Sequence, residues 1–299
     1  MQIFITGGLG FVGTHLSNYL LNQGHQVTAV GRPSSQHQIT HDNYRYLAAD
    51  TTQSGQWQQA LNDIDAVVNL AGKSIFKRWS EKHKQHIYDS RVLTTRNVVS
   101  ALPAGKKITL CSASGAGYYG NRADDILDEA QPPGDDFLAR VSIDWEKEAL
   151  QAVEKGIRTV TMRFGIILGK NGGAMAKMIP AFKGFIGGPM GSGRQWFPWI
   201  HVDDLMAAIV FIWQNQQISG PVNFCAPNPV RNRDLAKSLG KILNRPAVMP
   251  APAFMIRLVL GEFGNVLLDS QRAMPDKLLK HGFQFKYPDI EKAIAAVIQ

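Results

Sequence analysis

The chain has 299 residues, 44% of them hydrophobic, and its 28 Gly and 15 Pro are ordinary numbers for a folded protein, so the composition excludes a disordered or fibrous chain. At roughly 100–200 residues per domain, this length predicts one large domain or two smaller ones. Lys and Arg together number 32 against 24 Asp and Glu, and the resulting net charge of +8 favours anionic partners without choosing among them.

The first half of the chain alternates short apolar runs with longer amphipathic segments, which is typical of βαβ units on a parallel sheet. We expect helices at about 11–22, 80–101 and 136–154. Strands are predicted at Ile3–Ile5, Gln26–Val30, Tyr44–Ala48, Ala66–Leu70, Ile108–Ser112 and Thr159–Phe164. These elements predict an α/β fold with a doubly wound parallel sheet.

The composition changes after Arg163, because residues 164–196 contain nine glycines. Such a stretch indicates either loops that bend sharply beside a ligand or a flexible surface connection. Beyond it we expect a helix at 203–214 and a strand near 222–225 that returns to the first sheet. We therefore divide the chain into a domain at 1–165 and a smaller, mostly helical part at 166–299.

The two cysteines, Cys111 and Cys225, lie far apart and in no metal-ligand spacing, so we expect neither a disulfide framework nor a metal site. The apolar start of the chain lacks a basic leader, and no apolar run reaches the roughly 18 residues of a membrane span. We therefore expect a cytoplasmic protein without a membrane partner. Basic residues crowd segment 73–107, but without a recognised binding motif we interpret them as a solvated helix face and expect no nucleic acid partner.

The first predicted strand is followed at once by a glycine-rich turn and an amphipathic helix. Gly7 permits the tight turn, Gly10 leaves room for a pyrophosphate at the helix N-terminus, and Gly13 lets the helix lie close to the strand. Strand, turn and helix in this order predict a dinucleotide-binding site. Its expected contact residues are Thr6, Gly7, Gly10, Phe11, Val12 and Gly13.

The end of the second predicted strand distinguishes the two nicotinamide cofactors, because NAD sites usually place an acid there and NADP sites a cation. This chain has no acid at that point. Arg32 offers a forked donor for a 2′-phosphate and Ser34 offers a hydroxyl, so we predict NADP (NADPH) rather than NAD.

Two further strand ends carry candidate cofactor contacts. Asp50, after the third strand, either accepts a hydrogen bond from the adenine amino group or caps a turn. The fourth strand ends in Asn69, Leu70, Ala71 and Gly72, where small residues would let the backbone approach the nicotinamide ribose. We expect contacts from Asn69, Ala71 and Gly72.

These motifs resemble the extended short-chain dehydrogenase/reductases over almost the whole chain. The resemblance rests on T-G-x-x-G-x-x-G at 6–13, N-x-A-G at 69–72, Ser112-Ala113-Ser114, Tyr119-Gly120 and His201-Val202-Asp203-Asp204. Arg78-Trp79, Asp89-Ser90-Arg91, residues 112–120 and 132–137, and Gly282-Phe283 are similar to an atypical subgroup, the nucleoside-diphosphate-sugar epimerase-like "epimerase family proteins", also labelled homologues of a cell-division inhibitor. The resemblance implies a Rossmann domain, with the substrate held between it and the C-terminal part.

The wider superfamily transfers its proton with a Tyr-x-x-x-Lys pair, in which the lysine lowers the pKa of the phenol. At the matching helix this chain has Val141 and Trp145, and neither can carry a proton. The resemblance makes Ser114 the catalytic serine and leaves Tyr118 or Tyr119 as a proton donor. Ser114 could equally cap the segment that follows its strand.

For the substrate, Arg194 and Trp196 lie at the end of the glycine-rich stretch and are candidate binding residues for a small molecule that carries an anion. A sugar nucleotide is the generic expectation for the extended fold. His201 is either a base oriented by an acid or the start of a helix capped by Asp203 or Asp204.

The sequence thus predicts an NADP-dependent oxidoreductase or epimerase-like enzyme with an unknown substrate. The alternative is a non-catalytic NADP(H)-binding sensor or assembly protein that has lost the tyrosine and lysine. The sequence does not specify the oligomeric state.

Overall fold

A central parallel sheet positions the rest of the chain in the computed structural model, which describes residues 1–32, 39–170 and 172–298. Within these residues the sheet has seven strands in the order β11-β7-β5-β4-β1-β2-β3, and all neighbours are parallel. Its strands are β1 (Gln2–Thr6), β2 (Gln26–Gly31), β3 (Tyr44–Ala48), β4 (Ala66–Asn69), β5 (Thr109–Gly115), β7 (Arg158–Phe164) and β11 (Gly220–Phe224). The predicted doubly wound α/β fold is confirmed.

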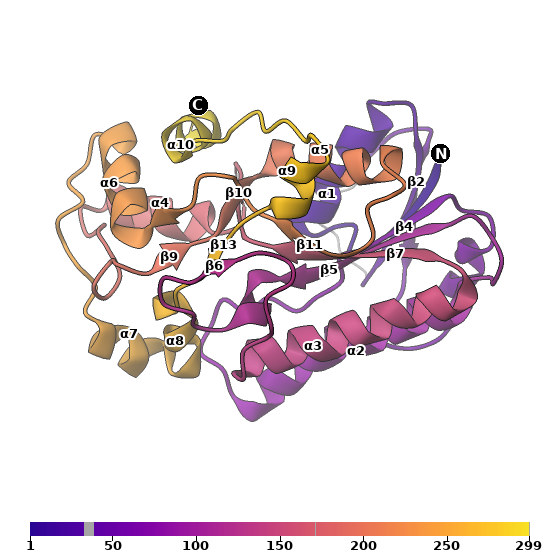
Figure 1. The fold of residues 1–299 in the computed structure, drawn as a ribbon, viewed down its shortest axis with the longest axis horizontal. Coiled ribbons are helices and arrows are strands. Elements are labelled where there is room, and N and C mark those ends of the chain that lie inside the picture. The colour runs from indigo at the N-terminus through magenta and orange to yellow at the C-terminus, as the bar shows by residue number, and fades with distance from the viewer. Residues whose placement is uncertain (33–38, 171, 299) are drawn as a thin grey trace.

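Helices cover both faces of the sheet (Figure 1). On one face lie α1 (Phe11–Leu21) and α5 (Val202–Gln214), and on the other α2 (Glu81–Ala101) and α3 (Phe137–Leu150). Successive residues of a strand point to opposite faces, so Ile3 and Ile5 of β1 join the apolar cluster beneath α1 and α5, whereas Phe4 joins the cluster that includes residues of α2. Burial on both faces explains the uninterrupted apolar runs in the sequence.

Helix α5 and strand β11 both lie beyond residue 165, where the sequence analysis ended the first domain. Even so, β11 belongs to the central sheet and α5 to the layer that covers it. Strand β11 pairs with β7 at the edge of the sheet. His201 caps α5, because its Nδ1 accepts a hydrogen bond from the backbone N–H of Asp203 at 3.1 Å. The expectation that Asp203 or Asp204 caps this helix is therefore wrong. Asp204 instead accepts backbone hydrogen bonds from residues 286 and 287.

A second apolar cluster organises the C-terminal part around Leu168, Met175, Trp199, Leu235 and Ile294. The helices here are α4 (Met175–Lys183), α6 (Asn232–Leu243), α7 (Ala253–Leu260), α8 (Glu262–Leu268), α9 (Asp276–Lys280) and α10 (Ile290–Ile298). Short strands pair as β8 (Ile166–Leu168) with β10 (Trp199–His201), β9 (Trp196–Phe197) with β12 (Val230–Arg231), and β6 (Ile126–Leu127) with β13 (Arg272–Ala273). Three short 3-10 helices are η1 (Gln56–Leu61), η2 (Ala116–Tyr119) and η3 (Gln151–Lys155).

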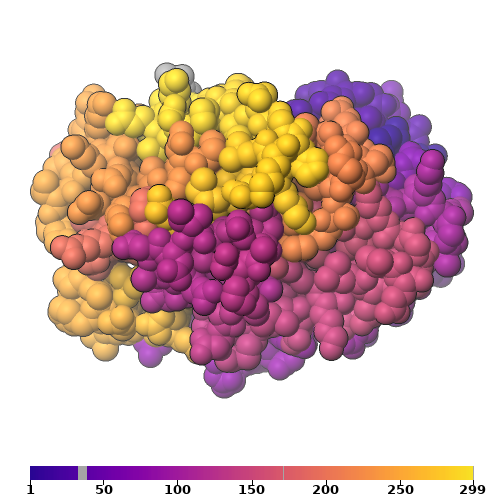
Figure 2. Space-filling model, viewed as in Figure 1, coloured from indigo at the N-terminus to yellow at the C-terminus, as the bar shows by residue number. Residues whose placement is uncertain are grey.

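The pairing of β6 with β13 joins segments that lie far apart in the sequence. In Figure 2 the loop around β6 (magenta) lies against the C-terminal segment (yellow) on one face of the molecule. No helix among the described residues is both long and apolar enough to cross a membrane. The paired segments bring residues from both halves of the chain to the carboxyl ends of the central strands.

Candidate functional site

Two cavities adjoin at the carboxyl ends of the central strands. The cofactor cavity, as we name the first, has a volume of about 820 Å³ and is lined by Gly7, Gly10, Arg32, Asp50 and Ala71, among others. The substrate cavity has a volume of about 740 Å³. Leu70, Gly72 and Lys73 line both cavities, so one stretch of chain separates them.

The glycine-rich turn has the shape that a pyrophosphate requires. Gly7 has a φ of +67°, which disfavours any residue with a side chain. A Cβ on Gly13 would lie 2.4 Å from the carbonyl oxygen of Gly7, so α1 packs against the turn as closely as its backbone allows. Gly10 begins α1 without a side-chain cap, which leaves the first N–H groups of the helix available to an anion. These residues fit a dinucleotide.

Thr6 and Asn69 are fully buried and do not line the cofactor cavity, so their contact with the cofactor stays a prediction. The hydroxyl of Thr6 donates to Asn69 Oδ1 at 2.6 Å and accepts from the N–H groups of Leu70 and Ala71. The side-chain amide of Asn69 donates to Thr95 and Ser112. Both residues therefore fix the loop that separates the two cavities.

The remaining cofactor candidates divide between the cavities. Arg32 is exposed and lines the cofactor cavity, whereas Ser34 lies outside the described residues. Asp50 lines the same cavity and caps a turn, because its Oδ1 accepts from the N–H and the hydroxyl of Thr52. Phe11 and Val12 line the substrate cavity rather than the cofactor cavity.

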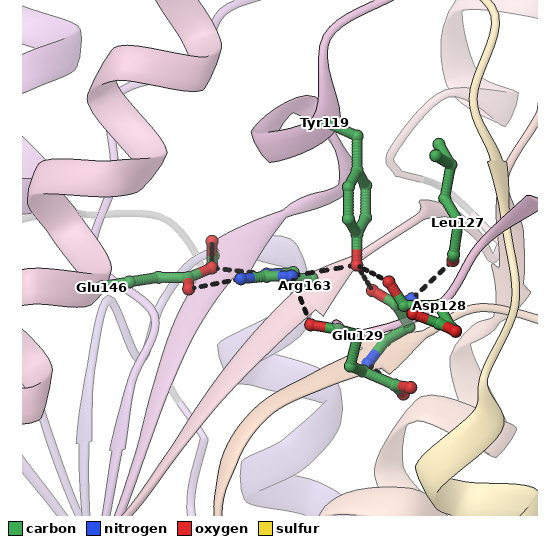
Figure 3. Close-up of polar contacts among 8 residues, drawn as sticks. Tyr119, Leu127, Asp128, Glu129, Glu146 and Arg163 are labelled. Carbon is green, nitrogen blue, oxygen red and sulfur yellow. Dashed lines mark hydrogen bonds and ion pairs between the residues drawn. The ribbon is translucent and has the colours of Figure 1, made fainter. Parts of the chain in front are cut away.

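Ser114 lines the substrate cavity, and a buried ion pair orients its hydroxyl. Its Oγ donates to Oε1 of Glu146 at 2.7 Å. Arg163 donates through Nε and Nη2 to the two carboxylate oxygens of Glu146 at 2.8 and 2.9 Å (Figure 3). Because Glu146 holds the proton of Ser114, the lone pairs of this hydroxyl remain for a donor group in the cavity.

Neither candidate tyrosine lines the substrate cavity. Tyr119 is fully buried, and its hydroxyl donates to Asn223 and to the carbonyl of Asp128 while it accepts from Arg163 (Figure 3). Burial raises the pKa of this phenol far above its usual range. The ring of Tyr118 lies 3.5 Å from the guanidinium carbon of Arg163. Both tyrosines contact Arg163 and hold it in place, and a tyrosine proton donor stays a prediction.

The substrate cavity has one carboxyl, that of Asp269, among the described residues that line it. Burial, reinforced by the nearby Asp136, raises the pKa of Asp269 to about 6. Val141 and Trp145 line the same cavity, so the positions of the missing tyrosine and lysine present apolar surface. Of the two substrate candidates, Trp196 lines the cavity and Arg194 is exposed outside it.

No sequence motif pointed to Glu146, Arg163 or Asp269. The sequence did contain a signal for Arg163 and Glu146. Arg163 is a charge near the end of an apolar strand, and a charge buried in a parallel sheet requires a partner. Glu146, one residue after Trp145 on the adjoining helix, is that partner. No comparable pattern marks Asp269, because it ends a short helix in a segment of unremarkable composition.

Comparisons with known proteins agree with this geometry. Residues 3–224 match the family model described as the NAD dependent epimerase/dehydratase family, and residues 251–297 match a domain of unknown function (DUF1731). The chain is 40% identical to the epimerase family protein YfhF of Bacillus subtilis, covering 100% of this chain and 98% of that protein. It is 39% identical to the chloroplastic epimerase family protein SDR39U1 homolog of Arabidopsis thaliana, covering 100% of this chain and 87% of that protein. A crystal structure of the human epimerase family protein SDR39U1 with NADPH superposes with a TM-score of 0.86 at 31% identity, covering 99% of each chain.

Proposed function

The chain belongs to the NAD-dependent epimerase/dehydratase family, and from this premise we propose that it is an NADP-dependent oxidoreductase or epimerase-like enzyme acting on a small-molecule substrate. The observation that carries the proposal is the junction of the two cavities at Leu70, Gly72 and Lys73. A glycine turn that fits a pyrophosphate lies on one side of this junction, and a polar group oriented toward a substrate lies on the other.

Two observations support NADP rather than NAD. Arg32 stands at the end of β2 and lines the cofactor cavity, where its guanidinium would pair with a 2′-phosphate. The human relative was crystallised with NADPH. Gly7 and Gly10 would hold the pyrophosphate, and Ala71 and Gly72 would face the nicotinamide ribose.

Each polar group of the substrate cavity has a distinct proposed role. The nicotinamide, when bound, gives or takes a hydride. Ser114 holds the oxygen on the reacting carbon, and Glu146 and Arg163 keep the hydroxyl of Ser114 in one orientation. Asp269 takes up or releases the proton, because an acid whose pKa lies near the working pH transfers protons most efficiently.

Cofactor binding tests the proposal through thermal denaturation in the presence of NADPH, NADP⁺, NADH and NAD⁺. A ligand at 100 times its dissociation constant stabilises the folded state by about 2.7 kcal/mol, so the two phosphorylated cofactors should raise the melting temperature clearly. In Arg32→Ala we expect the affinity for NADPH to fall at least tenfold and that for NADH to stay unchanged. Arg45→Ala, which removes an exposed arginine from β3, is the matched control. No stabilisation by any of the four cofactors would refute the proposal.

The second candidate function is a non-catalytic NADP(H)-binding sensor or assembly protein. It is favoured by Val141 and Trp145, since loss of a general acid or base typically costs 10²–10⁴-fold in rate. Wild type and Ser114→Ala, incubated with NADPH and a panel of carbonyl compounds and sugar nucleotides, distinguish the two functions. Oxidation of NADPH that depends on Ser114 supports the enzyme, whereas tight binding with no turnover across the panel supports the sensor.

We also propose that the protein resides in the cytoplasm. Cys111 and Cys225 are free and buried, which suits a reducing compartment. Cell fractionation tests this location. Nucleic acid and membranes are not among the partners that we propose.

A further inference from the structure

Arg91 is a charged side chain on the wall of the substrate cavity that has no acidic partner. Its Nη1 donates to the backbone carbonyls of Lys73 and Ile87 at 3.1 and 3.0 Å. No carboxylate in the described part of the chain forms an ion pair with it, and burial alone lowers the pKa of its guanidinium to about 10. A cation removed from water without a counterion is costly, so this site favours an anion.

The guanidinium is held in a fixed place at the junction of the two cavities. On one side it lies against Gly72, where an added Cβ would be only 3.2 Å from its central carbon. On the other side its central carbon lies 5.2 Å from the centre of the Trp145 ring. Nη1 is occupied by the two carbonyls, whereas Nη2 and Nε have no hydrogen-bond partner among the described residues. This free edge matches the two oxygens of a carboxylate or phosphate.

The charge around this edge has one predominant sign. Lys73 and Lys177 also line the substrate cavity, and neither forms an ion pair with a described residue. The opposing charge on the cavity wall is Asp269. Arg91 and the two lysines thus outnumber the acid, and the net positive potential favours an oxyanion.

Apart from the charged groups, the cavity wall is predominantly apolar, with Ser114 among its few polar side chains. Aromatic rings from both halves of the chain line it, together with aliphatic side chains. The rings are those of Phe11, Phe76, Trp145, Phe164, Trp196, Phe197 and Phe263. Such a wall suits a flat or aliphatic body rather than the hydroxyl-rich body of a sugar nucleotide.

We propose that the substrate is an apolar organic acid whose oxyanion binds the free edge of Arg91 while its body packs against the aromatic wall. The inference rests on the proposed function, because it assigns the substrate class of the same site. A cofactor phosphate has the same oxyanion chemistry as a substrate acid group, so the test separates these two sources.

The experiment measures binding to the NADPH-saturated protein by calorimetry and thermal denaturation. The probes are octanoate and 1-naphthylacetate, each compared with its neutral amide, and UDP-glucose represents the sugar nucleotides. In the wild type we expect each acid to bind at least tenfold more tightly than its amide and more tightly than UDP-glucose. In Arg91→Gln the ratio of acid to amide affinity should fall to nearly one, and Arg91→Lys should restore part of it.

Arg233→Gln removes an exposed arginine on α6 and should keep the wild-type ratio. Circular dichroism and NADPH affinity verify that each variant is folded. A wild type that does not prefer the acids, or an Arg91→Gln variant that keeps the preference, overturns the proposal. Loss of NADPH affinity in Arg91→Gln together with indifference of the wild type to the acids assigns Arg91 to the cofactor phosphates instead, which also overturns it.

Failure of the proposed function gives a different result. If NADPH does not bind at all, the dinucleotide assignment is wrong, and the comparison of acids with amides is made on the cofactor-free protein. A preference for acids that Arg91→Gln abolishes then still supports the anion site, and absence of that preference refutes it.

Discussion

Asp269 has an unusual protonation equilibrium that makes stability depend on pH. Burial raises its pKa to about 6, whereas a carboxyl in the unfolded chain ionises near 3.9. The folded state therefore binds the proton more tightly, so this stabilising contribution is complete below pH 3.9 and is lost as the pH rises through 6. Above pH 6 the ionised carboxylate therefore reduces the stability of the fold.

Replacing Asp269 with Asn removes the destabilisation that the ionised carboxylate causes in the folded state. We expect Asp269→Asn to be more stable than the wild type by about 1–2 kcal/mol at pH 7.5, less than the full linkage value because the side chain is only partly buried. The advantage should shrink steadily toward pH 4, as urea denaturation between pH 4 and 8 would reveal. Asp135→Asn alters an exposed carboxyl and serves as the control. An advantage that does not vary with pH would contradict the assignment.

At the scale of single residues, the sequence predicted those candidate positions that a local motif defines. Gly7, Gly10 and Gly13 follow from strand, turn and helix in succession, and Ser114 stands at a strand end. Thr6 and Asn69 belong to the same motifs, but the sequence does not reveal that their side chains bond to each other across two strands. Such a contact depends on which strands are neighbours.

At the scale of elements, the contact between α1 and the glycine turn governs the cofactor cavity. Gly13→Ala would gain about 1 kcal/mol of helix propensity, but its Cβ would lie 2.4 Å from a backbone oxygen that has little freedom to move. We expect a net loss of about 1–2 kcal/mol in the free energy of unfolding and weaker NADPH binding. Urea denaturation and calorimetry measure both. Gly55→Ala, whose Cβ would meet nothing nearer than 3.6 Å, should change neither.

Helix α3 illustrates what the sequence predicts about an element and what it omits. Its position follows from the apolar periodicity, and Asp136 caps it through the N–H of Ala139. The resemblance located the missing tyrosine and lysine on this helix. It did not indicate that Glu146 on the same helix faces β7 and orients Ser114, because that relation needs the packing of α3 against the sheet.

At the scale of the whole molecule, Asn223 on β11 connects three segments that are distant in sequence. Its amide donates to the carbonyls of Leu127 and Met274, and its oxygen accepts from Tyr119. Asn223→Ala leaves these buried groups without partners, and we expect a loss of about 2–4 kcal/mol in the free energy of unfolding. Denaturation in urea measures it. Asn228→Ala, which breaks an exposed contact to Asp289, should cost under about 1 kcal/mol.

The architecture of the sheet was predictable because long apolar strands alternate with amphipathic helices in the first half of the chain. The short paired strands β8, β9 and β10 were not predictable from the sequence, because an element of two or three residues is too short to show a hydrophobic periodicity. They form where the glycine-rich stretch crosses the ends of the sheet. Residues of β8 and β9 line part of the substrate cavity beside residues of β5 and α3, so the sequence did not reveal which segments meet there.

The place of β11 in the sheet also sets an order of events during synthesis. Six of the strands have left the ribosome once residue 164 has emerged, but β11 becomes available only after residue 224. Until then β7 presents an open edge with unpaired backbone groups, and Val160 and Met162 lack the apolar neighbours that α5 later supplies. A nascent chain that pauses between these points exposes an edge strand that can pair with other chains.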